Sequence, residues 1–480
     1  CQVYVQNHAF YLMSYIVMKN TEQLISKAIT LLNQGKSERA RLICNKIVLE
    51  APLHYQAQLL LGVIALSKQE NALAEKHLRI ACDAATSKHS KAQALNNLSL
   101  SLISQQRLSE ALTAINDAIQ LKPQPLFYCN RANIFEQLSR WPEMQQDLIT
   151  AISLSPDITT EAYTSLAVAK RHLREFTTAL QLLEQNPDHT DQDWLNEWAL
   201  LHGINQQLEN VKEYIHGVQL SDDALIALGD YALEQSHPEI ALSLYLMVQD
   251  LLAQRSLSDH SVLTHQLNAL QGIPSLQAPR EYVESLFDSC AGQFEERLVR
   301  QLHYRLPERM VEQLLPILPQ RSLSVIDLGC GTGLLGKALS PHANIASMTG
   351  IDLSEQMIKQ ASKSGCYQHL IHGDIVDNLA PFSDTDLIMA ADVLIYLGDL
   401  SALFSNSYQA LSTGGLFIFS IERCEEAWKL TPSGRYQHSA DYIKELSDDM
   451  GFIHHLSNEC QLRLEKNKPV AGEIYILQKP

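Results

Sequence analysis

Residues 324–333 are predicted to form an apolar strand that runs directly into glycines at alternate positions, Gly329, Gly331 and Gly333. Glycine at this spacing lets the backbone turn sharply and approach a ligand closely. Residues 334–339 then have the pattern of a helix. A strand, a glycine-rich turn and a helix in this order indicate a parallel α/β sheet that binds a nucleotide-type cofactor at the end of its first strand.

Two carboxylates help to distinguish a dinucleotide from a cofactor that carries positive charge. Asp327 stands two residues before Gly329, where it would repel a pyrophosphate but suits a cofactor with a cationic amino group and a sulfonium. Asp352 ends the next predicted strand, residues 347–351, and an acid there can accept hydrogen bonds from both ribose hydroxyls. NAD enzymes share the second feature, so Asp352 indicates cofactor binding without choosing between the two cofactors.

Three further signals follow in order. Asp374 comes after a short predicted strand at 367–371, residues 386–394 form a fourth strand, and residues 414–420 form a turn and a fifth strand. The five signals together resemble the class I methyltransferases that use S-adenosylmethionine (SAM). That resemblance implies a Rossmann-like, seven-stranded domain from about Tyr282 to the end of the chain.

The resemblance also implies a set of cofactor-binding residues. In class I enzymes the residue at Asp374 accepts a hydrogen bond from the adenine amino group, and the apolar residue after it packs on the ring. The end of the fourth strand reaches the methionine part of the cofactor. The predicted SAM-binding residues are Asp327, Gly329, Cys330, Gly331, Gly333, Asp352, Leu353, Met357, Asp374, Ile375 and Ala391.

The first half of the chain is almost entirely helical in pattern, and small residues recur in it at a helix-packing position. Ala40, Ala74, Ala111 and Ala179 occupy that position, with Met144 between the last two. This resembles the tetratricopeptide repeat (TPR), with an unrelated helical bundle as the alternative. The best units are 21–54, 55–88, 92–124, 125–157 and 160–190, and a degenerate unit is predicted at 222–254.

A TPR superhelix binds partners on its concave face and does not catalyse. Asn97 and Asn130 fall at the same position of consecutive units, where some TPR proteins hold a peptide backbone with an asparagine ladder. The alternative is that both are surface or capping residues. The array predicts a protein or peptide partner on the concave face.

The whole chain resembles predicted bacterial methyltransferases that carry N-terminal TPRs. Cys290 departs from that pattern, because relatives commonly have tyrosine there. The family is largely uncharacterised, so it implies no substrate. The matching stretches are 282–288, 294–299, 302–307, 392–400, 432–439, 462–465 and 469–472.

Methyl transfer from SAM is an in-line displacement that chiefly requires the acceptor to be held against the methyl group, and a base is needed only for a protonated acceptor. The catalytic candidates are Asp392, Tyr396 and His438. Candidates for substrate binding are Tyr304, Arg305 and Arg435, the last through a substrate carboxylate. Alternatively, Arg435 and His438 only hold their loop, and Tyr304 and Arg305 pack a helix, 287–306, onto the sheet edge.

Net charge, cysteine spacing and the absence of certain motifs argue against nucleic-acid, zinc and membrane binding. The formal net charge of −17 disfavours nucleic-acid binding, and the Pro-Pro-aromatic motif of DNA amino-methyltransferases is missing after the fourth strand, so we predict that DNA is not an acceptor. The nine cysteines include no CxxC pair, which indicates a cytoplasmic protein without zinc. The apolar run at 10–17 is too short to cross a membrane.

The predicted chain is of the α + α/β class. It comprises a disordered upstream extension at 1–17, a TPR domain at 18–255, a linker at 256–280 and a SAM-dependent methyltransferase domain at 281–480. The leading hypothesis is an enzyme whose TPR array recruits a partner or protein substrate. The alternatives are a small-molecule methyltransferase that uses its TPRs for assembly, and a SAM-binding scaffold.

Overall fold

The structure is a computed structural model, and it divides into two compact units that meet between Gln219 and Leu220. The predicted extension at 1–17 lies outside the residues that the structure describes. The described residues are 21–155, 160–187, 190–254, 260–292, 294–295, 304–465 and 468–480.

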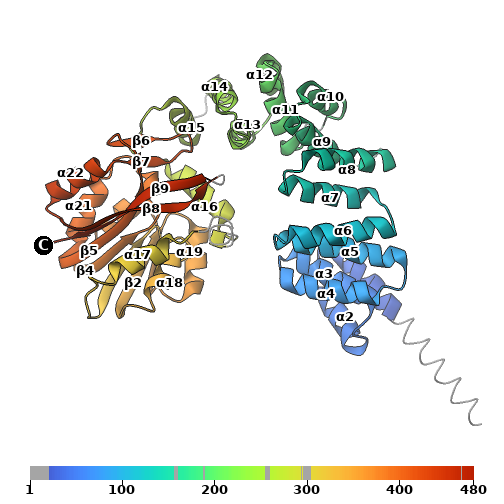
Figure 1. The fold of residues 1–480 in the computed structure, drawn as a ribbon, viewed down its shortest axis with the longest axis horizontal. Coiled ribbons are helices and arrows are strands. Elements are labelled where there is room, and N and C mark those ends of the chain that lie inside the picture. The colour runs from blue at the N-terminus through green and yellow to red at the C-terminus, as the bar shows by residue number, and fades with distance from the viewer. Residues whose placement is uncertain are drawn as a thin grey trace, which may run out of the picture. The chain divides into compact units, whose positions relative to one another are not determined.

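The first unit consists of helices that pack on their neighbours in chain order, as Figure 1 shows. After a helical stretch at 21–33, they are α2 (Ser37–Glu50), α3 (Tyr55–Ser67), α4 (Asn71–Ala84), α5 (Lys88–Ser104), α6 (Leu108–Leu121), α7 (Pro125–Gln137), α8 (Trp141–Leu154), α9 (Thr160–His172), α10 (Phe176–Gln185), α11 (Gln192–Ile204) and α12 (Leu208–Gly217). The recurring alanines are fully buried between them. Gly62 is required in α3, because a Cβ there would lie 2.5 Å from Cγ of Leu78 in α4.

One backbone feature marks each helical hairpin. The turn between its two helices passes through a residue in the left-handed region, with φ from 54° to 66°, at Gln69, Gln106, Ser139, Arg174, Gln206 and Ser236. Each of these precedes a buried residue by five positions, for example Ala74 after Gln69 and Ala111 after Gln106. The same local conformation therefore recurs along the array, as a repeat predicts.

The turn at Gln206 belongs to a hairpin, α11 and α12, that the sequence pattern did not predict. Large residues, Trp194 and Trp198, are buried in α11, and Val211 takes the place of the small residue in α12. The two tryptophan rings stack 5.7 Å apart. In the other hairpins a small residue lets the two helices pack closely. In this hairpin large side chains fill the space between the helices, so the regular spacing of small residues in the sequence is lost although the hairpin still forms.

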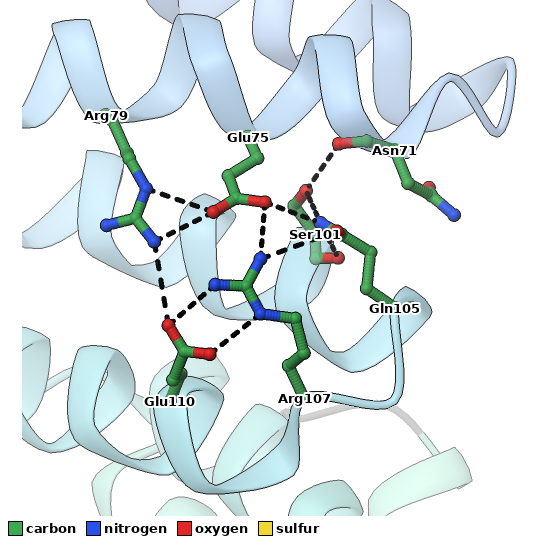
Figure 2. Close-up of polar contacts among 7 residues, drawn as sticks. All are labelled: Asn71, Glu75, Arg79, Ser101, Gln105, Arg107 and Glu110. Carbon is green, nitrogen blue, oxygen red and sulfur yellow. Dashed lines mark hydrogen bonds and ion pairs between the residues drawn. The ribbon is translucent and has the colours of Figure 1, made fainter.

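Ion pairs join successive hairpins at equivalent positions. Arg41 of α2 pairs with Glu70 before α4, at 3.0 Å. Glu75 of α4 pairs with Arg107 before α6, at 2.7 Å, with the signs reversed. Figure 2 shows the second pair within a network that also includes Arg79, Gln105 and Glu110.

The second unit begins upstream of the predicted domain boundary. Its first helices are α13 (Asp222–Glu234), α14 (Pro238–Gln254), α15 (Ser261–Gln271), α16 (Arg280–Cys290) and α17 (Leu306–Leu314). The last TPR-like hairpin, α13 and α14, thus belongs to the compact unit that contains the sheet. A large tyrosine, Tyr245, fills the space over Gly229 between those two helices.

The described part of the predicted linker is packed structure. His265 of α15 is buried and contacts the carbonyl of Gly434 through Nε2 at 2.9 Å. The amide of Ala278 donates to the carbonyl of Tyr396, and the carbonyl of Leu276 accepts from the amide of Gly398. Gly272 does end α15, with φ of 68°, but the residues after it pair with the sheet domain and do not form a loose joint.

A mixed sheet of seven strands forms the centre of the second unit, in the order β3-β2-β1-β4-β5-β9-β8. The pairs from β3 to β5 are parallel, and β9 is antiparallel to both of its neighbours. This order confirms the predicted Rossmann-like class. The strands are β1 (Leu323–Leu328), β2 (Ile345–Asp352), β3 (His369–His372), β4 (Thr385–Ala390), β5 (Leu411–Glu422), β8 (Ile453–Glu465) and β9 (Lys468–Gln478).

Helices cover both faces of the sheet. In β1, Val325 packs in a cluster with α17 and α18, and the next residue, Ile326, packs in a second cluster with α20, α21 and α22. Alternation of this kind follows from the pleat of a strand buried on both faces. The helices are α18 (Leu334–Leu339), α19 (Glu355–Ala361), α20 (Ile375–Leu379), α21 (Ser401–Ala410) and α22 (Ala440–Met450), and short 3-10 turns lie at η2 (Ser362–Ser364) and η3 (Leu394–Tyr396).

Two local predictions need correction. The helix predicted at 287–306 is not continuous: α16 ends at Cys290, and Tyr304 and Arg305 are outside any helix. Pro307 stands in the first turn of α17, where it favours a new helix start. The polar stretch at 433–439 is not only a loop, because it includes β7 (Tyr436–His438), which pairs with β6 (Trp428–Leu430) in a hairpin.

Candidate active site

A cavity of about 240 Å³ lies at the carboxyl ends of β1, β2 and β4. In a parallel α/β sheet this is the edge at which ligands bind. The glycine-rich turn after β1 forms one wall. Residues of α16, namely Arg280, Val283 and Phe287, form another. The cavity is therefore lined both by α16, which precedes the sheet in the sequence, and by residues at the ends of the strands.

The glycine-rich turn has the conformation that its sequence predicted. Gly329, Gly331 and Gly333 have φ of 62°, 53° and 90°, values that other residues rarely adopt. A Cβ on Gly329 would lie 2.4 Å from Cγ2 of Val393. By contrast, among the described residues a Cβ on Gly331 would meet only Cε1 of Phe294, at 3.9 Å, which leaves space for a ligand between these residues.

Asp352 connects the turn to β2. Its Oδ2 accepts from the amide of Gly331 at 2.8 Å, and its Oδ1 accepts from the amide of Ser354 at 2.8 Å. Burial raises the pKa of Asp352, and these two amides oppose the rise. Each carboxylate oxygen has a second lone pair, so Asp352 can hold the turn and still accept from two ligand hydroxyls.

Asp327 lies at the back of the cavity and is almost fully buried. The hydroxyl of Tyr367 donates to its Oδ2 at 2.6 Å. Burial raises the pKa of Asp327 to about 7, and the nearby Asp352 adds to the rise, while the hydrogen bond from Tyr367 opposes it. A buried carboxylate of this kind gains most from a ligand that brings a positive charge.

Asp374 caps α20 and lines the cavity. Its Oδ1 accepts from the amides of Val376 and Asp377, at 2.8 and 3.2 Å. Its Oδ2 lies 3.6 Å from Nη2 of Arg280, which also pairs with Asp377. The cap fixes the direction of the carboxylate, and Arg280 of α16 closes this end of the cavity.

A different group of charges lies at the other end. Asp392 follows β4 with φ of 59°, and both of its carboxylate oxygens accept from Nη1 of Arg463, at 2.7 and 2.9 Å. Nη2 of Arg463 donates to Glu422. Arg463 is thus a buried guanidinium between two carboxylates, which places both of its terminal nitrogens in ion pairs.

Tyr304, Tyr396 and Arg435 complete this end of the cavity wall. Burial raises the pKa of both tyrosines, so their hydroxyls stay protonated. Neither hydroxyl has a hydrogen-bond partner within the described ranges. Nη1 of Arg435 donates to Oε2 of Glu465 at 2.5 Å.

Helix α16 is held against the cofactor end by polar contacts. Oδ1 of Asp288 accepts from the hydroxyl of Ser354 at 2.5 Å and from the amide of Gln356 at 3.3 Å. The ring of Phe287 meets that of Tyr396 edge-on, with centroids 5.6 Å apart. These contacts at both of its sides make α16 a cover over the cavity.

The residues present fit a polar cofactor such as SAM. The hydroxyl of Thr332 lines the cavity, is buried, and has no partner among the described residues. An orphaned hydroxyl of this kind suits a ligand that can bond to it. Together with the open space beside Gly331 and the buried acid at Asp327, it favours a ligand with both hydrogen-bonding groups and positive charge.

Comparison with known proteins agrees with this geometry. The family model described as methyltransferase domain matches residues 326–419, and that described as tetratricopeptide repeat matches residues 25–89. The strand order and the first of these matches decide the assignment. The chain carries a class I SAM-dependent methyltransferase domain after a TPR region.

Curated relatives of the methyltransferase domain share part of its length. The ubiquinone biosynthesis O-methyltransferase of Idiomarina loihiensis is 30% identical over 133 residues, which are 24% of this chain and 53% of that protein. The malonyl-[acyl-carrier protein] O-methyltransferase of Bacillus cereus is 29% identical over 112 residues, 22% of this chain and 42% of the relative. The chain thus spans about half the length of the curated relatives it matches.

Two solved methyltransferase structures are similar to part of this chain. The magnesium protoporphyrin IX methyltransferase of Synechocystis with bound SAM is 20% identical, with a TM-score of 0.33, and the match covers 42% of this chain and 97% of that one. The N-methyltransferase of Bradyrhizobium japonicum in complex with S-adenosyl-L-homocysteine is 22% identical, with a TM-score of 0.31, over 40% of this chain and 98% of the other.

Most of the predicted cofactor residues of the methyltransferase domain lie on one cavity wall. Two do not: Gly333 caps α18 and packs near Tyr367, and Met357 is buried in α19. Those that line the cavity are Asp327, Gly329, Cys330, Gly331, Asp352, Leu353, Asp374, Ile375 and Ala391.

The weaker candidates separate into two groups. Asp392, Tyr396, Tyr304 and Arg435 line the cavity of the methyltransferase domain, whereas Arg305 is exposed at the start of α17. His438 is fully buried in β7 outside the cavity wall, and its Nε2 contacts the carbonyl of Gly398 at 3.1 Å. Because burial lowers the pKa of His438 to about 4, it is a neutral residue that holds the hairpin.

Sequence reasoning missed Arg463 and the residues of α16. Arg463 stands in the stretch 462–465 that carries the family resemblance, but nothing local indicates that it contacts Asp392, 71 residues away. For Phe287 the available signal was an amphipathic helix ahead of the first strand. That pattern predicts packing on the sheet domain, not a place over the cofactor.

Within the described ranges, no helix is both long and apolar enough to cross a membrane. In the same part of the chain, no group of three or more His, Cys, Asp or Glu residues is arranged to hold a metal ion. The seven cysteines whose side chains are described are free thiols.

Proposed function

We propose that this protein transfers the methyl group of SAM to an acceptor that enters the covered cavity, and that its TPR array recruits a protein partner that carries or delivers the acceptor. The observation that carries the proposal is the convergence of Asp327, Asp352 and Asp374 on one cavity beside an open glycine turn. Each acid can bind a different part of the cofactor.

We assign roles to the cofactor-end residues from the resemblance to class I enzymes and from their place in the cavity lining. Asp327 balances the amino group of the methionine part, Asp352 accepts from the ribose hydroxyls, and Asp374 accepts from the adenine amino group. SAM supplies a methyl group that its sulfonium already activates. The protein positions the acceptor and excludes water, and α16 serves the second purpose by covering the cavity.

The acceptor is a small molecule or a slender group on a larger one. The cavity has a volume of about 240 Å³, which suits a small molecule or a small group and not a bulky folded surface. A small group tethered to a protein satisfies both the covered cavity and the TPR array. Two curated relatives are named as O-methyltransferases, and one of them as acting on malonyl-[acyl-carrier protein], which supports an oxygen acceptor carried in this way.

Recognition of the partner by an asparagine ladder is not part of the proposal. Nδ2 of Asn97 donates to the carbonyl of Gln93 in its own helix, and Nδ2 of Asn130 donates to Oδ1 of Asn96. Both amides therefore make contacts within the array. The proposal of a protein partner rests on the repeat architecture, which offers a long surface for an extended segment.

Calorimetry with SAM tests the cofactor site. Wild-type protein should bind SAM with micromolar affinity, as an order-of-magnitude expectation for a cofactor. Asp352→Asn should weaken binding by about tenfold or more, because hydrogen bonds to a charged acceptor are worth about 1.5–3 kcal/mol. Asp449→Asn, an exposed acid of α22, serves as the control and should leave the affinity unchanged. Equal affinity in all three proteins would remove Asp352 from the site.

Labelled SAM tests delivery of the acceptor. With a lysate freed of small molecules, the full chain should label one or a few proteins, and residues 220–480 alone should label them poorly while still binding SAM. Equal labelling by the shorter protein would mean that the repeats do not deliver the acceptor. Labelling only after the small-molecule fraction is restored would favour the metabolite alternative, and labelled DNA would overturn the prediction that DNA is not an acceptor.

A further inference from the structure

We propose that Arg435 forms a subsite for a carboxylate on the acceptor, at the end of the cavity opposite Asp374. The inference rests on the proposed methyl transfer and assigns the chemical class of its substrate. Arg435 lines the cavity, and its side chain is 24% exposed, whereas that of Arg463 is 6% exposed. Of the two guanidiniums at this end, Arg435 is the one that a ligand can reach.

The two arginines also differ in how many of their guanidinium nitrogens already have a hydrogen-bond partner. Arg463 uses Nη1 for Asp392 and Nη2 for Glu422. Arg435 uses only Nη1, for Glu465, and no described residue accepts from its Nε or Nη2. Those two nitrogens form the side-on edge of the guanidinium, which matches the two oxygens of a carboxylate.

The backbone around Arg435 is fixed from both sides. The amide of Thr431 donates to the carbonyl of Arg435 at 2.8 Å, and the carbonyl of Gly434 contacts Nε2 of His265 at 2.9 Å. Next along the chain, the hydroxyl of Tyr436 contacts that of Ser275 at 2.6 Å. A side chain on such a turn loses little backbone freedom when it binds a ligand, so more of the interaction appears as affinity.

The neighbouring groups suit an anionic acceptor once the cofactor is bound. Tyr304 and Tyr396 present protonated hydroxyls on the same wall, which are possible donors to an oxygen. The local carboxylates Asp392, Glu422 and Glu465 outnumber the two arginines by one, and the sulfonium of a bound cofactor adds the balancing positive charge. Binding of a carboxylate should therefore be strongest in the presence of the sulfonium.

The cavity also has an apolar part that a simple aromatic acid would fill. Val283, Phe287 and Ile395 line it, with the rings of Phe287 and Tyr396 edge-on at 5.6 Å. Benzoate, benzamide and benzyl alcohol share one ring and differ only in the polar group. They form a matched set of probes for the chemistry that Arg435 recognises.

The experiment is calorimetric titration of each probe into the full-length protein saturated with SAM. Benzoate should bind at least about tenfold more tightly than benzamide or benzyl alcohol, as a charge-assisted bidentate contact predicts. Arg435→Gln should abolish that preference. Arg435→Lys should keep part of it, because lysine retains the charge without the fork.

Arg321→Gln is the matched control, because Arg321 also makes one ion pair with a carboxylate but does not line the cavity. It should keep the benzoate preference, and melting temperatures establish that each variant is folded. Equal binding of the three probes by the wild type, binding of none of them, or an unchanged preference in Arg435→Gln would overturn the carboxylate subsite. Failure of the wild type to bind SAM at all would overturn the proposed function as well, so the two failures are distinguishable.

Discussion

Asp327 shows how one buried residue can make cofactor binding depend on pH. Its pKa is raised to about 7, chiefly by burial, so the free protein holds a mixture of neutral and ionised carboxyl groups near neutrality. The ionised form attracts the amino group of SAM, which remains protonated below pH 7. Affinity for SAM should therefore rise with pH up to about 7.

The expected slope is up to about tenfold in affinity for each pH unit below the pKa, as linkage of one proton requires. Calorimetry with SAM from pH 5.5 to pH 7 measures it. Asp327→Asn should bind weakly and with little pH dependence, since the amide does not titrate in this range. The same slope in that variant would assign the effect to another group.

Gln106 shows the cost of a left-handed residue in a repeat turn. Its φ is 59° and its side chain is exposed, so backbone conformation is the main determinant of its effect on stability. Gln106→Gly should stabilise the protein by about 0.5–1 kcal/mol, because glycine adopts this region without strain. Gln106→Ala should be close to neutral. Urea unfolding compares the three proteins, and a loss of stability in the glycine variant would contradict the assignment.

Among the elements, successive hairpins are joined by charge as well as by packing. Glu75 pairs with Arg107 of the next hairpin and has a side chain only 16% exposed. A double-mutant cycle with Glu75→Gln and Arg107→Gln should give a favourable coupling that weakens as salt is added.

The pair Arg140 and Glu143 is the control for this cycle. Both side chains are exposed and lie within a single turn, so the same cycle should give a smaller coupling than that of Glu75 and Arg107. Urea unfolding at low and high salt measures both couplings. A larger coupling for the exposed pair would mean that the contact between hairpins does not contribute to the stability of the array.

The sequence predicted those elements whose conformation is set by nearby residues. The strand before Gly329 and the glycine turn needed only apolar pattern and backbone preference, and the structure has both. The hairpin of α11 and α12 was missed because its large side chains replace the small-residue signal. Likewise, the break after Cys290 was missed because the amphipathic pattern of α16 continues past the residues at which the helix ends.

The residues of the candidate site also fall into those that the sequence could predict and those that it could not. Asp327 and Asp352 lie at the carboxyl ends of β1 and β2, and Asp374 follows the end of β3. The carboxyl ends of parallel strands meet at one edge of a sheet, so the sequence could predict the convergence of these three acids. Arg463 and Phe287 reach the cavity only because β8 and α16 pack where they do. That packing depends on the tertiary fold, which no local pattern in the sequence encodes.

For the whole molecule, the compact unit that contains the sheet begins at Leu220, upstream of the predicted domain start at 281. We predict that residues 220–480 form a stable protein that binds SAM. A chain that begins at 281 should melt at a markedly lower temperature, because it lacks the buried His265 and the carbonyl of Leu276 that accepts from the amides of Gly398 and Asp399. Thermal melting and calorimetry compare the two. Equal melting temperatures would restore the boundary that the sequence predicted.

The ion pair between Asp392 and Arg463 has a consequence for the order in which a new chain can become active. During synthesis the residues from Asp327 to Ile375 leave the ribosome well before Arg463 does, and domains fold as their residues emerge. The contact spans 71 residues and joins Asp392 to β8, so it can form only after the last two strands of the sheet are available. A nascent chain would thus complete the region around its glycine turn first and the region around Asp392 last, so that methyl transfer would begin only after the final strand pair has formed.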